Sequence, residues 1–149
     1  MNAAARPRSA WRDGALQVDG GGTLGQVVAT QAVDEAVERS EHLAAVACTL
    51  RDSGHLSALG LFTLRAAERG RVALLCQKTP PIMALPGASG PAIGNNPIAF
   101  AAPVAGGLPL VFDMAASTVV RGHVLQALRD GAPIPPTGRS APTARRPTT

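Results

Sequence analysis

The chain has 149 residues, of which 46% are hydrophobic and 3% aromatic, and its formal net charge at pH 7 is +4. This length provides one domain with a core built mainly from Ala, Val and Leu, and it is too short for two domains of ordinary size. No apolar run reaches the roughly 18 residues of a membrane helix, so a membrane-spanning protein is not expected. No apolar stretch follows the first arginines, so we predict no secretory signal and a cytoplasmic location.

The positive charge lies near the two ends of the chain, at Arg6, Arg8, Arg12, Arg139, Arg145 and Arg146. A nucleic-acid-binding protein usually presents a basic stripe on a structured face, often with aromatic residues between the charges. This distribution therefore argues against nucleic acid as a partner. The histidines and cysteines are too scattered to predict a metal site, and Cys48 and Cys76 are expected to be free thiols within apolar runs.

The first elements are predicted in the order strand, helix, strand. Residues 1–14 are rich in Ala, Arg and Pro without periodicity and are predicted to be a disordered leader. A short strand is predicted at 15–19, and residues 26–42 carry apolar positions at helical spacing, which indicates an amphipathic helix. The run at 43–50 (LAAVACTL) is nearly all apolar and predicts an interior strand.

Between the first strand and the helix lies the sequence GGGTLG, at residues 20–25. It matches Gly-x-Gly-x-x-Gly, in which backbone amides approach a dinucleotide pyrophosphate at a helix N-terminus. The preceding strand is short and polar, and no acidic residue ends a second strand about 20 positions later. We therefore interpret the glycines as a flexible turn that starts a helix, with a small Rossmann domain as the alternative.

A histidine turn follows the second strand, with the sequence Asp-Ser-Gly-His-Leu at 52–56. A helix is predicted at 58–69, ending at Gly70, and then a strand at 72–76. A histidine in a glycine-containing turn between an apolar strand and a helix is placed to meet a ligand. The competing interpretation of His55 is a capped or core histidine.

Residues 79–97 hold prolines at positions 80, 81, 86, 91 and 97, which disfavour helix and most strand pairing. So long a loop inside a compact domain is usually functional. Strands at 98–102 and 108–112 are predicted to form a hairpin, followed by a helix at 117–129 with Ser117 as N-cap and Gly131 as stop. Residues 136–149 are predicted to be a disordered tail.

Polar residues interrupt the otherwise apolar sequence at 52–56, 94–97 and 113–117, and we predict that these three breaks form the walls of one site. The sequence contains several short motifs in a specific order and at specific spacings. In chain order they are Asp19-Gly20 with Leu24-Gly25-Gln26, Ser53-Gly54-His55 with Ala58-Leu59-Gly60, Thr79-Pro80-Pro81, Gly87, Gly94-x-Asn96-Pro97, Asp113-Met114-Ala115-x-Ser117 and Gly131-x-Pro133-Ile134-Pro135. Together they resemble the malate/L-lactate dehydrogenase family of the non-Rossmann type. That family also includes ureidoglycolate and sulfolactate dehydrogenases, and 2,3-diketogulonate and cyclic-imine reductases.

The resemblance implies an α/β fold with a mainly antiparallel sheet and flanking helices, truncated at both ends. Residues 15–135 would then be a partial dinucleotide-binding and catalytic domain. The implied activity is hydride transfer between NAD or NADP and a small 2-hydroxy or 2-oxo acid, in a protein that is a homodimer at full length.

The resemblance also implies roles for individual residues. His55 would be the proton donor and acceptor, which suits an imidazole that titrates near neutral pH. The implied cofactor contacts are Thr79, Asp113, Met114, Ala115 and Ser117, and the implied substrate-side residues are Ser53 and Asn96. Helix capping is the alternative for Asp113 and Ser117, and support of the loop backbone is the alternative for Asn96.

The chain also departs from the family pattern. Asn95 replaces a Thr, Ser57 replaces a Gly, and an N-terminal Ser-His-Gly segment and a later cofactor-contacting lysine have no counterpart. A non-catalytic remnant or a small nucleotide-binding module is therefore the second hypothesis. The sequence GRSAPTARRP at 138–147 suggests a frameshift near Pro136, which the coding DNA would test.

Overall fold

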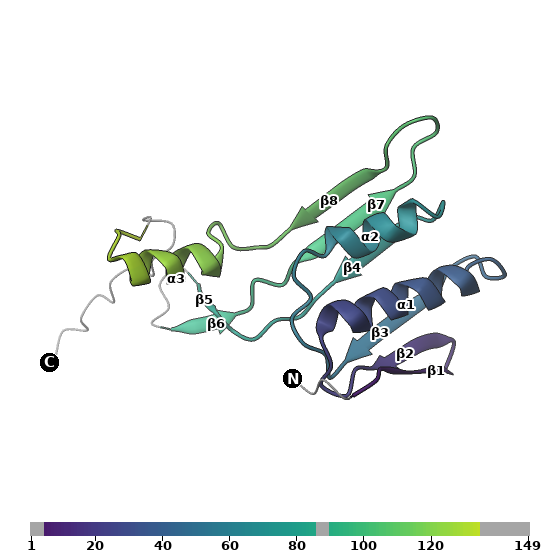
Figure 1. The fold of residues 1–149 in the computed structure, drawn as a ribbon, viewed down its shortest axis with the longest axis horizontal. Helices are drawn as coiled ribbons and strands as arrows, with labels where there is room; N and C mark the ends of the chain where they lie inside the picture. Colours follow the sequence, from purple (N-terminus) through teal and green to yellow (C-terminus); the bar gives the residue numbers. More distant parts are fainter. Residues whose placement is uncertain (1–4, 86–89, 135–149) are drawn as a thin grey trace, which may run out of the picture. The chain divides into compact units, whose positions relative to one another are not determined.

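The computed structural model describes residues 5–85 and 90–134 (Figure 1). Its elements, in chain order, are β1 (Arg8–Arg12), β2 (Ala15–Asp19), α1 (Gly25–Arg39), β3 (Ala47–Arg51), α2 (Gly60–Ala67), β4 (Ala73–Cys76), β5 (Met83–Ala84), β6 (Pro91–Ile93), β7 (Ile98–Ala102), β8 (Leu110–Met114) and α3 (Arg121–Asp130).

The chain divides into two compact units. The first contains the residues up to Leu75 together with Ile98–Asp113, and the second contains Cys76–Pro97 and the residues from Met114 onward. The histidine turn belongs to the first unit and most of the proline-rich loop to the second. Each unit is described separately below.

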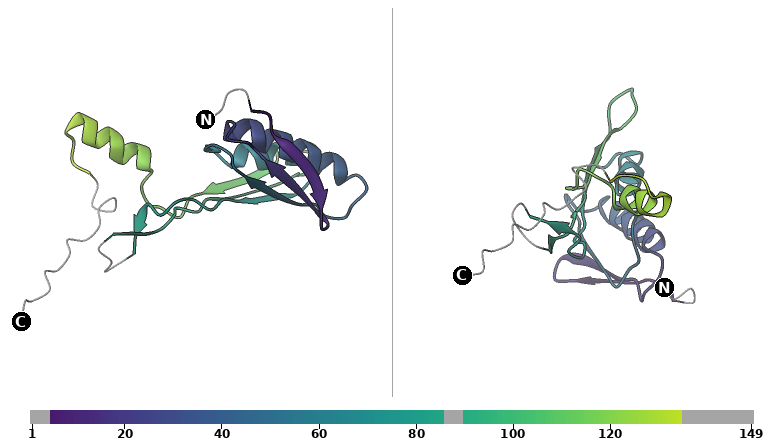
Figure 2. Two further views of the ribbon diagram at one scale, coloured as in Figure 1. Left: turned by 90° about the horizontal axis from the view of Figure 1, so that it is seen from below. Right: turned by 90° about the vertical axis from the view of Figure 1, so that its left-hand side faces the viewer.

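One sheet of the first unit has the strand order β1-β2-β3. β1 and β2 form an antiparallel hairpin, whereas β2 and β3 are parallel and are connected through α1. Leu16 and Val18 of β2 are fully or almost fully buried and pack against Val28 and Ala32 of α1. The two views of Figure 2 show the hairpin lying along α1.

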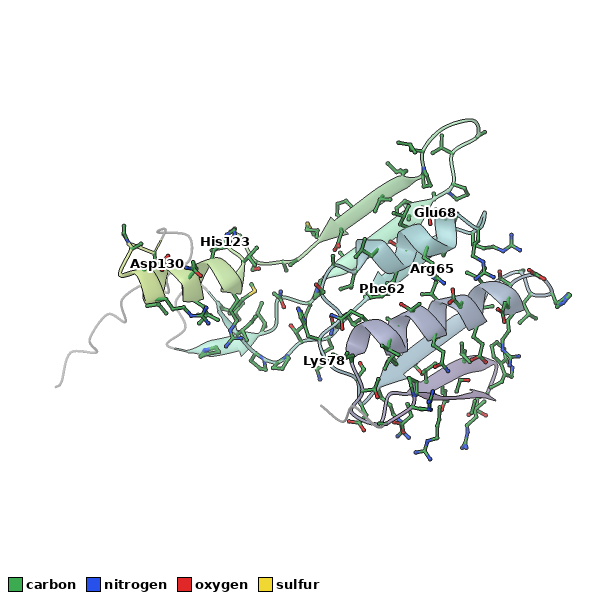
Figure 3. The ribbon with its side chains drawn as sticks, in the orientation of Figure 1. Phe62, Arg65, Glu68, Lys78, His123 and Asp130 are labelled. Atoms are coloured by element: carbon green, nitrogen blue, oxygen red, sulfur yellow. The ribbon has the colours of Figure 1, made fainter. Side chains whose placement is uncertain are left out.

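A second sheet has the order β4-β7-β8 and is covered by α2. The connection from β7 to β8 is short, so these neighbouring strands run antiparallel. The core here consists of Leu56, Leu59, Phe62 and Ala99, with Ala29 from α1. Figure 3 labels Phe62 of α2, which belongs to this core.

The helices α1 and α2 are joined by an ion pair. The Arg65 guanidinium donates two hydrogen bonds to Asp34, at 2.6 and 2.9 Å, and Arg69 donates a third at 3.3 Å. The hydrogen bond from Arg65 holds the pKa of the Asp34 carboxyl below its ordinary value.

The predicted α/β fold with mainly antiparallel strands and flanking helices is confirmed, with the β2–β3 pair as a parallel exception. The strands predicted at 15–19 and 98–102 have the predicted bounds, and Gly131 ends α3 in the left-handed conformation. The cysteines Cys48 and Cys76 are free, and burial raises the pKa of the Cys48 thiol to about 11.

The prediction of a disordered leader is wrong for residues 8–12, which form β1. Asp13 and Gly14 both have positive φ, of 52° and 76°, and they make the two-residue turn that returns the chain into β2. An Asp-Gly pair in this conformation is a strong hairpin signal. The Trp11 ring, stacked under the Arg39 guanidinium at 4.9 Å, adds a contact to α1.

Other elements also differ from the prediction, and the strand predicted at 108–112 lies at Leu110–Met114. β3 covers only Ala47–Arg51. Short strands β5 and β6 form inside the proline-rich loop. Pro91 is the first residue of β6, a position at which the missing backbone N–H of proline is tolerated. α3 begins at Arg121, so Ser117 is not its N-cap; Val120 takes that position without a side-chain cap.

Gly87, Pro135, the tail at 136–149 and its suggested frameshift lie outside the described residues. Among the helices that the structure describes, none has both the length and the apolar character needed to cross a membrane.

Candidate active site

The histidine turn connects β3 to α2 and holds an unusual backbone. Asp52 has a φ of 49° and Ser57 a φ of 69°, so residues other than glycine adopt the left-handed conformation on both sides of His55. Such strain costs on the order of 1–3 kcal/mol per residue and concentrates at functional sites. The His55 side chain is exposed, Ser53 beside it is half-buried, and within residues 5–85 and 90–134 the imidazole has no hydrogen-bond partner.

The glycine run at 20–25 packs against this turn through its backbone. Gly20 N–H donates to the Arg51 carbonyl at 2.9 Å, and Gly22 N–H donates to the Asp52 carbonyl at 2.8 Å. In the other direction, Gly54 N–H donates to the Thr23 carbonyl at 2.9 Å. The run therefore serves as a partner for the histidine turn.

These contacts argue against the Rossmann alternative, although the glycines do connect a strand to a helix. A pyrophosphate loop needs amides that point at the ligand. Here the Gly20 N–H donates to the carbonyl of Arg51 at the end of β3, and the Gly22 N–H donates to the carbonyl of Asp52 in the histidine turn. The Gly21 N–H donates to an Asp19 carboxylate oxygen at 3.0 Å, and this hydrogen bond is the main reason that the pKa of Asp19 is lowered.

Asp113 lies near the end of β8, and its carboxylate accepts a hydrogen bond from the Gly60 N–H at 2.7 Å. Gly60 is the first residue of α2, and the N-cap residue Leu59 makes no side-chain cap. The negative charge therefore satisfies an unpaired amide and interacts favourably with the helix dipole. Asp113 is a helix cap, as the capping alternative proposed, but of α2 and not of the helix that follows it in sequence.

In the second unit, Thr79 is enclosed by the loop that precedes β7. The Thr79 hydroxyl donates to the Asn95 side-chain oxygen at 2.8 Å, and the Thr79 N–H donates to the Asn96 side-chain oxygen at 3.1 Å. Gly94 is buried, and a Cβ there would overlap Thr79 and lie 2.7 Å from the Asn96 side-chain oxygen. Asn96 itself has a φ of 29°.

The same loop reaches the segment after β8, because Ala116 N–H donates to the Asn95 carbonyl at 2.8 Å. The structure thus brings Thr79 and Asn96 together, and Asn95 links them to the segment that contains Ala115 and Ser117. Met114 is the last residue of β8 and is exposed. His55, Ser53 and Asp113 belong to the other unit, so these contacts do not join the predicted residues into one site.

Sequence reasoning missed Asn95, Gly25 and Gly60 as residues that shape this region. The sequence marks Asn95 only as part of the polar break at 94–97 and as a departure from the family pattern. Gly25 and Gly60 each lie in one of the motifs that resemble the family. The close approach that requires glycine at these positions arises between segments far apart in the sequence, so the sequence alone does not reveal it.

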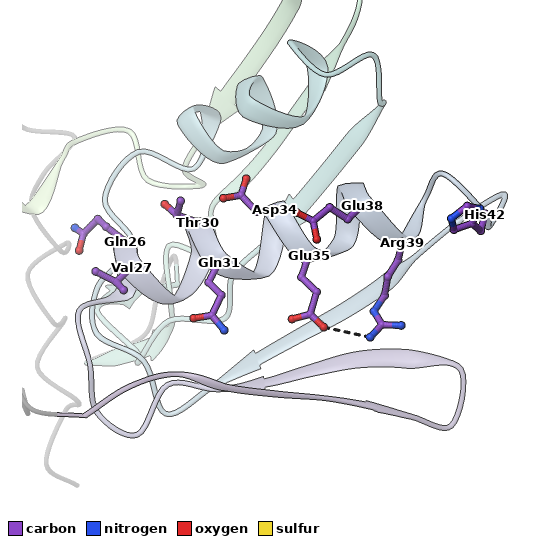
Figure 4. Close-up of a pocket in the computed structure, with 9 residues that line it drawn as sticks. All are labelled: Gln26, Val27, Thr30, Gln31, Asp34, Glu35, Glu38, Arg39 and His42. Carbon is purple, nitrogen blue, oxygen red and sulfur yellow. Dashed lines mark hydrogen bonds and ion pairs between the residues drawn. The ribbon is translucent and has the colours of Figure 1, made fainter.

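Among the surface cavities formed by described residues of the first unit, the two best defined are not lined by a predicted site residue. The larger, of about 980 Å³, runs along the exposed side of α1 from Gln26 to His42 and is lined by Asp34, Glu35 and Glu38 among others (Figure 4). The smaller, of about 370 Å³, includes Leu56 and Ser57, which follow His55. Of the two, only the smaller borders the histidine turn. The residues that the structure describes contain no group of three His, Cys, Asp or Glu side chains suited to a metal ion.

Comparison with known proteins places the chain in a family. The sequence model of the malate/L-lactate dehydrogenase family matches residues 1–147. The chain is 37% identical over 134 residues to the (2R)-3-sulfolactate dehydrogenase (NADP(+)) of Chromohalobacter salexigens, covering 90% of this chain and 40% of that protein. It is 35% identical to a malate dehydrogenase of Pyrococcus abyssi, covering 79% of this chain and 32% of that protein.

Solved structures agree with this result. A dehydrogenase from Sinorhizobium meliloti matches with a TM-score of 0.80 at 28% identity, covering 87% of this chain and 38% of that one. The Δ1-piperideine-2-carboxylate reductase of Pseudomonas syringae matches with a TM-score of 0.75 at 35% identity, covering 88% and 40%. The chain thus spans about 40% or less of the length of these relatives. By the match over nearly its whole sequence, the chain belongs to the malate/L-lactate dehydrogenase family.

Proposed function

We propose that this chain carries the proton-transfer histidine and part of the dinucleotide site of an NAD(P)-dependent oxidoreductase. Its substrate would be a small 2-hydroxy or 2-oxo acid. The relatives named above act on sulfolactate, malate or a cyclic imine carboxylate. In each of these compounds, the carbon that would exchange hydride is bonded to a carboxylate group. The same carbon is bonded to a hydroxyl oxygen or a ring nitrogen that must gain or lose a proton.

The observation that carries the proposal is the exposed imidazole of His55 between two left-handed residues. Nicotinamide, when bound, supplies or accepts the hydride. His55 would donate a proton to the carbonyl oxygen as hydride reaches carbon, and accept it in the oxidation direction, because an imidazole nitrogen can serve as both proton donor and proton acceptor. Ser53, in the same turn, would hydrogen-bond the substrate.

The groups in the second unit fit a dinucleotide by their chemistry. The Thr79 hydroxyl, the side chains of Asn95 and Asn96, and the backbone of Met114, Ala115 and Ser117 are uncharged donors and acceptors of the kind that bind ribose and phosphate oxygens. We assign the cofactor contacts to Thr79, Asp113, Met114, Ala115 and Ser117, and a substrate-side contact to Asn96. A homodimeric assembly and a cytoplasmic location stay predictions.

The proposal is tested by steady-state oxidation of NADH or NADPH with a panel of 2-oxo acids. His55→Gln is expected to lower kcat by on the order of 10²–10⁴-fold, the usual contribution of a general acid. His42→Gln, another exposed histidine, serves as the matched control and should retain the wild-type rate.

Turnover that is equal in His55→Gln and wild type would remove the assigned role of His55. Dinucleotide binding by the wild-type chain without any turnover would instead support the second candidate, a nucleotide-binding remnant. That candidate is favoured by one observation, the cluster of uncharged polar groups around Thr79.

A further inference from the structure

The glycine run at 20–25 has no role in the proposed chemistry, yet its last residue packs against the backbone of the histidine turn with no room for a side chain. Gly25 is buried, and a Cβ at this position would overlap the carbonyl oxygen of Gly54 and lie 2.6 Å from that of His55. A Cβ on Gly54 would lie 3.1 Å from the backbone nitrogen of Gly25. The two backbones can approach this closely only because both residues lack a side chain.

Hydrogen bonds fix the same pair of segments on both sides of Ser53. Gly22 donates to Asp52 at 2.8 Å, and Gly54 donates to Thr23 at 2.9 Å. These bonds hold the backbone that enters the histidine turn. The position of the peptide that carries His55 therefore depends on the start of α1.

A separate contact holds the backbone that leaves the turn. The Asp113 carboxylate accepts from the Gly60 N–H, and a Cβ on Gly60 would lie 3.0 Å from the Asp113 Cβ. β8 is thereby tied to the first residue of α2, the next helix after His55 in the chain.

The imidazole has no hydrogen-bond partner of its own among the described residues, so its placement comes from these backbone contacts. We propose that Gly25 and Asp113 are positioning residues for His55, Gly25 holding the peptide before the imidazole and Asp113 the helix after it. The importance of this placement for catalysis rests on the proposed function of His55, but the placement itself does not.

The test uses the imidazole resonances of the three histidines, recorded by NMR as a function of pH, with the His55 signal assigned through His55→Gln. Gly25→Ala is compared with Gly107→Ala, where the added Cβ meets only a Val104 side-chain atom at 3.5 Å. Asp113→Ala is compared with Asp113→Asn, which keeps an oxygen that accepts from the Gly60 N–H.

We expect Gly25→Ala and Asp113→Ala to change the chemical shift of the His55 imidazole alone across the pH series, while the chemical shifts of His42 and His123 stay unchanged. Gly107→Ala should change none, and Asp113→Asn should restore the His55 signal. A residue that only stabilises the fold would lower the melting temperature and leave the His55 signal unchanged, which would overturn its assignment. If Gly25→Ala does not fold, the two Asp113 variants decide the proposal.

Activity provides a second readout. A displaced imidazole should lower kcat by roughly 10–100-fold, because a misplacement of about 1 Å is costly. In Gly25→Ala, whose changed residue is not an assigned cofactor contact, the dissociation constant of NAD(P)H should stay within about twofold of the wild-type value. If the wild-type chain shows no turnover, the proposed function fails while the resonances still test the positioning. Unchanged resonances in an active enzyme would instead remove the positioning role and leave the function intact.

Discussion

Ser57 occupies a backbone conformation that normally belongs to glycine, with a φ of 69°. The left-handed conformation costs a residue with a Cβ about 1–2 kcal/mol. Ser57 lies just after His55, and its hydroxyl is not needed to explain the proposed chemistry. The backbone strain at Ser57 therefore lies between His55 and the start of α2.

Replacing Ser57 with glycine should stabilise the fold. The strain relieved is partly offset by the greater entropy of glycine in the unfolded chain, so the free energy of unfolding should rise by a few tenths to about 1 kcal/mol. Urea denaturation measures the difference. Ser57→Ala is the matched control, because alanine keeps the strain and should give no gain; equal stability of the Gly and Ala variants would show that the backbone strain is absent.

At the scale of elements, the contact between α1 and α2 combines an ion pair with an apolar core. The side chains of Asp34 and Arg65 are 30% and 48% exposed, so solvent screens the pair and its contribution should be below about 1 kcal/mol. Because the pKa of Asp34 is lowered in the folded state, the contribution is present at neutral pH and is lost as the pH falls through that lowered pKa.

Asp34→Asn should therefore be less stable than wild type at pH 7, by less than about 1 kcal/mol, and the difference should shrink as acid protonates the Asp34 carboxylate and vanish once it is fully protonated. Urea denaturation of both proteins across this range gives the comparison. Glu38→Gln on the exposed side of the same helix is the control and should show no such trend. A difference that grows toward acid pH would contradict the assigned direction of the Asp34 pKa.

The apolar part of the contact is tested by two neighbouring leucines. Leu59 is 1% exposed and belongs to the core, whereas Leu61 is 64% exposed. Leu59→Ala should lower the free energy of unfolding by about 2–5 kcal/mol, the usual cost of emptying a core position, and Leu61→Ala should change it by about 0.5 kcal/mol or less. Similar losses at both positions would mean that α2 buries a different face.

At the scale of elements, local sequence patterns predict some helices and strands correctly and leave others undetected. Strand β2 and the C-terminal stop of α3 follow from local pattern and turn chemistry, and both were predicted correctly. The hairpin of β1 was also encoded locally, in Asp13-Gly14, but the arginine-rich composition around it obscured the signal. The capping of α2 by Asp113 joins residues 53 positions apart, so no local pattern could predict it.

At the scale of the whole molecule, the candidate groups are divided between two units. His55 and Asp113 belong to the first, and Thr79, Asn96 and residues from Met114 onward belong to the second. Motif order indicated the family correctly, because it needs only sequence spacing. The predicted convergence of the three polar breaks on one site needs the arrangement of the units, which spacing along the chain does not encode.

The central claim is that this chain transfers hydride to the carbon beside a carboxylate with His55 as proton donor. Deuterium transfer tests it most directly: the protein is incubated with 4-deuterated NADH or NADPH and a 2-oxo acid, and the product is examined by mass spectrometry. The account predicts deuterium at carbon 2 of the hydroxy acid, and labelling at least about 100-fold slower in His55→Gln. Absence of label with every 2-oxo acid, or equal labelling by the variant, would contradict it.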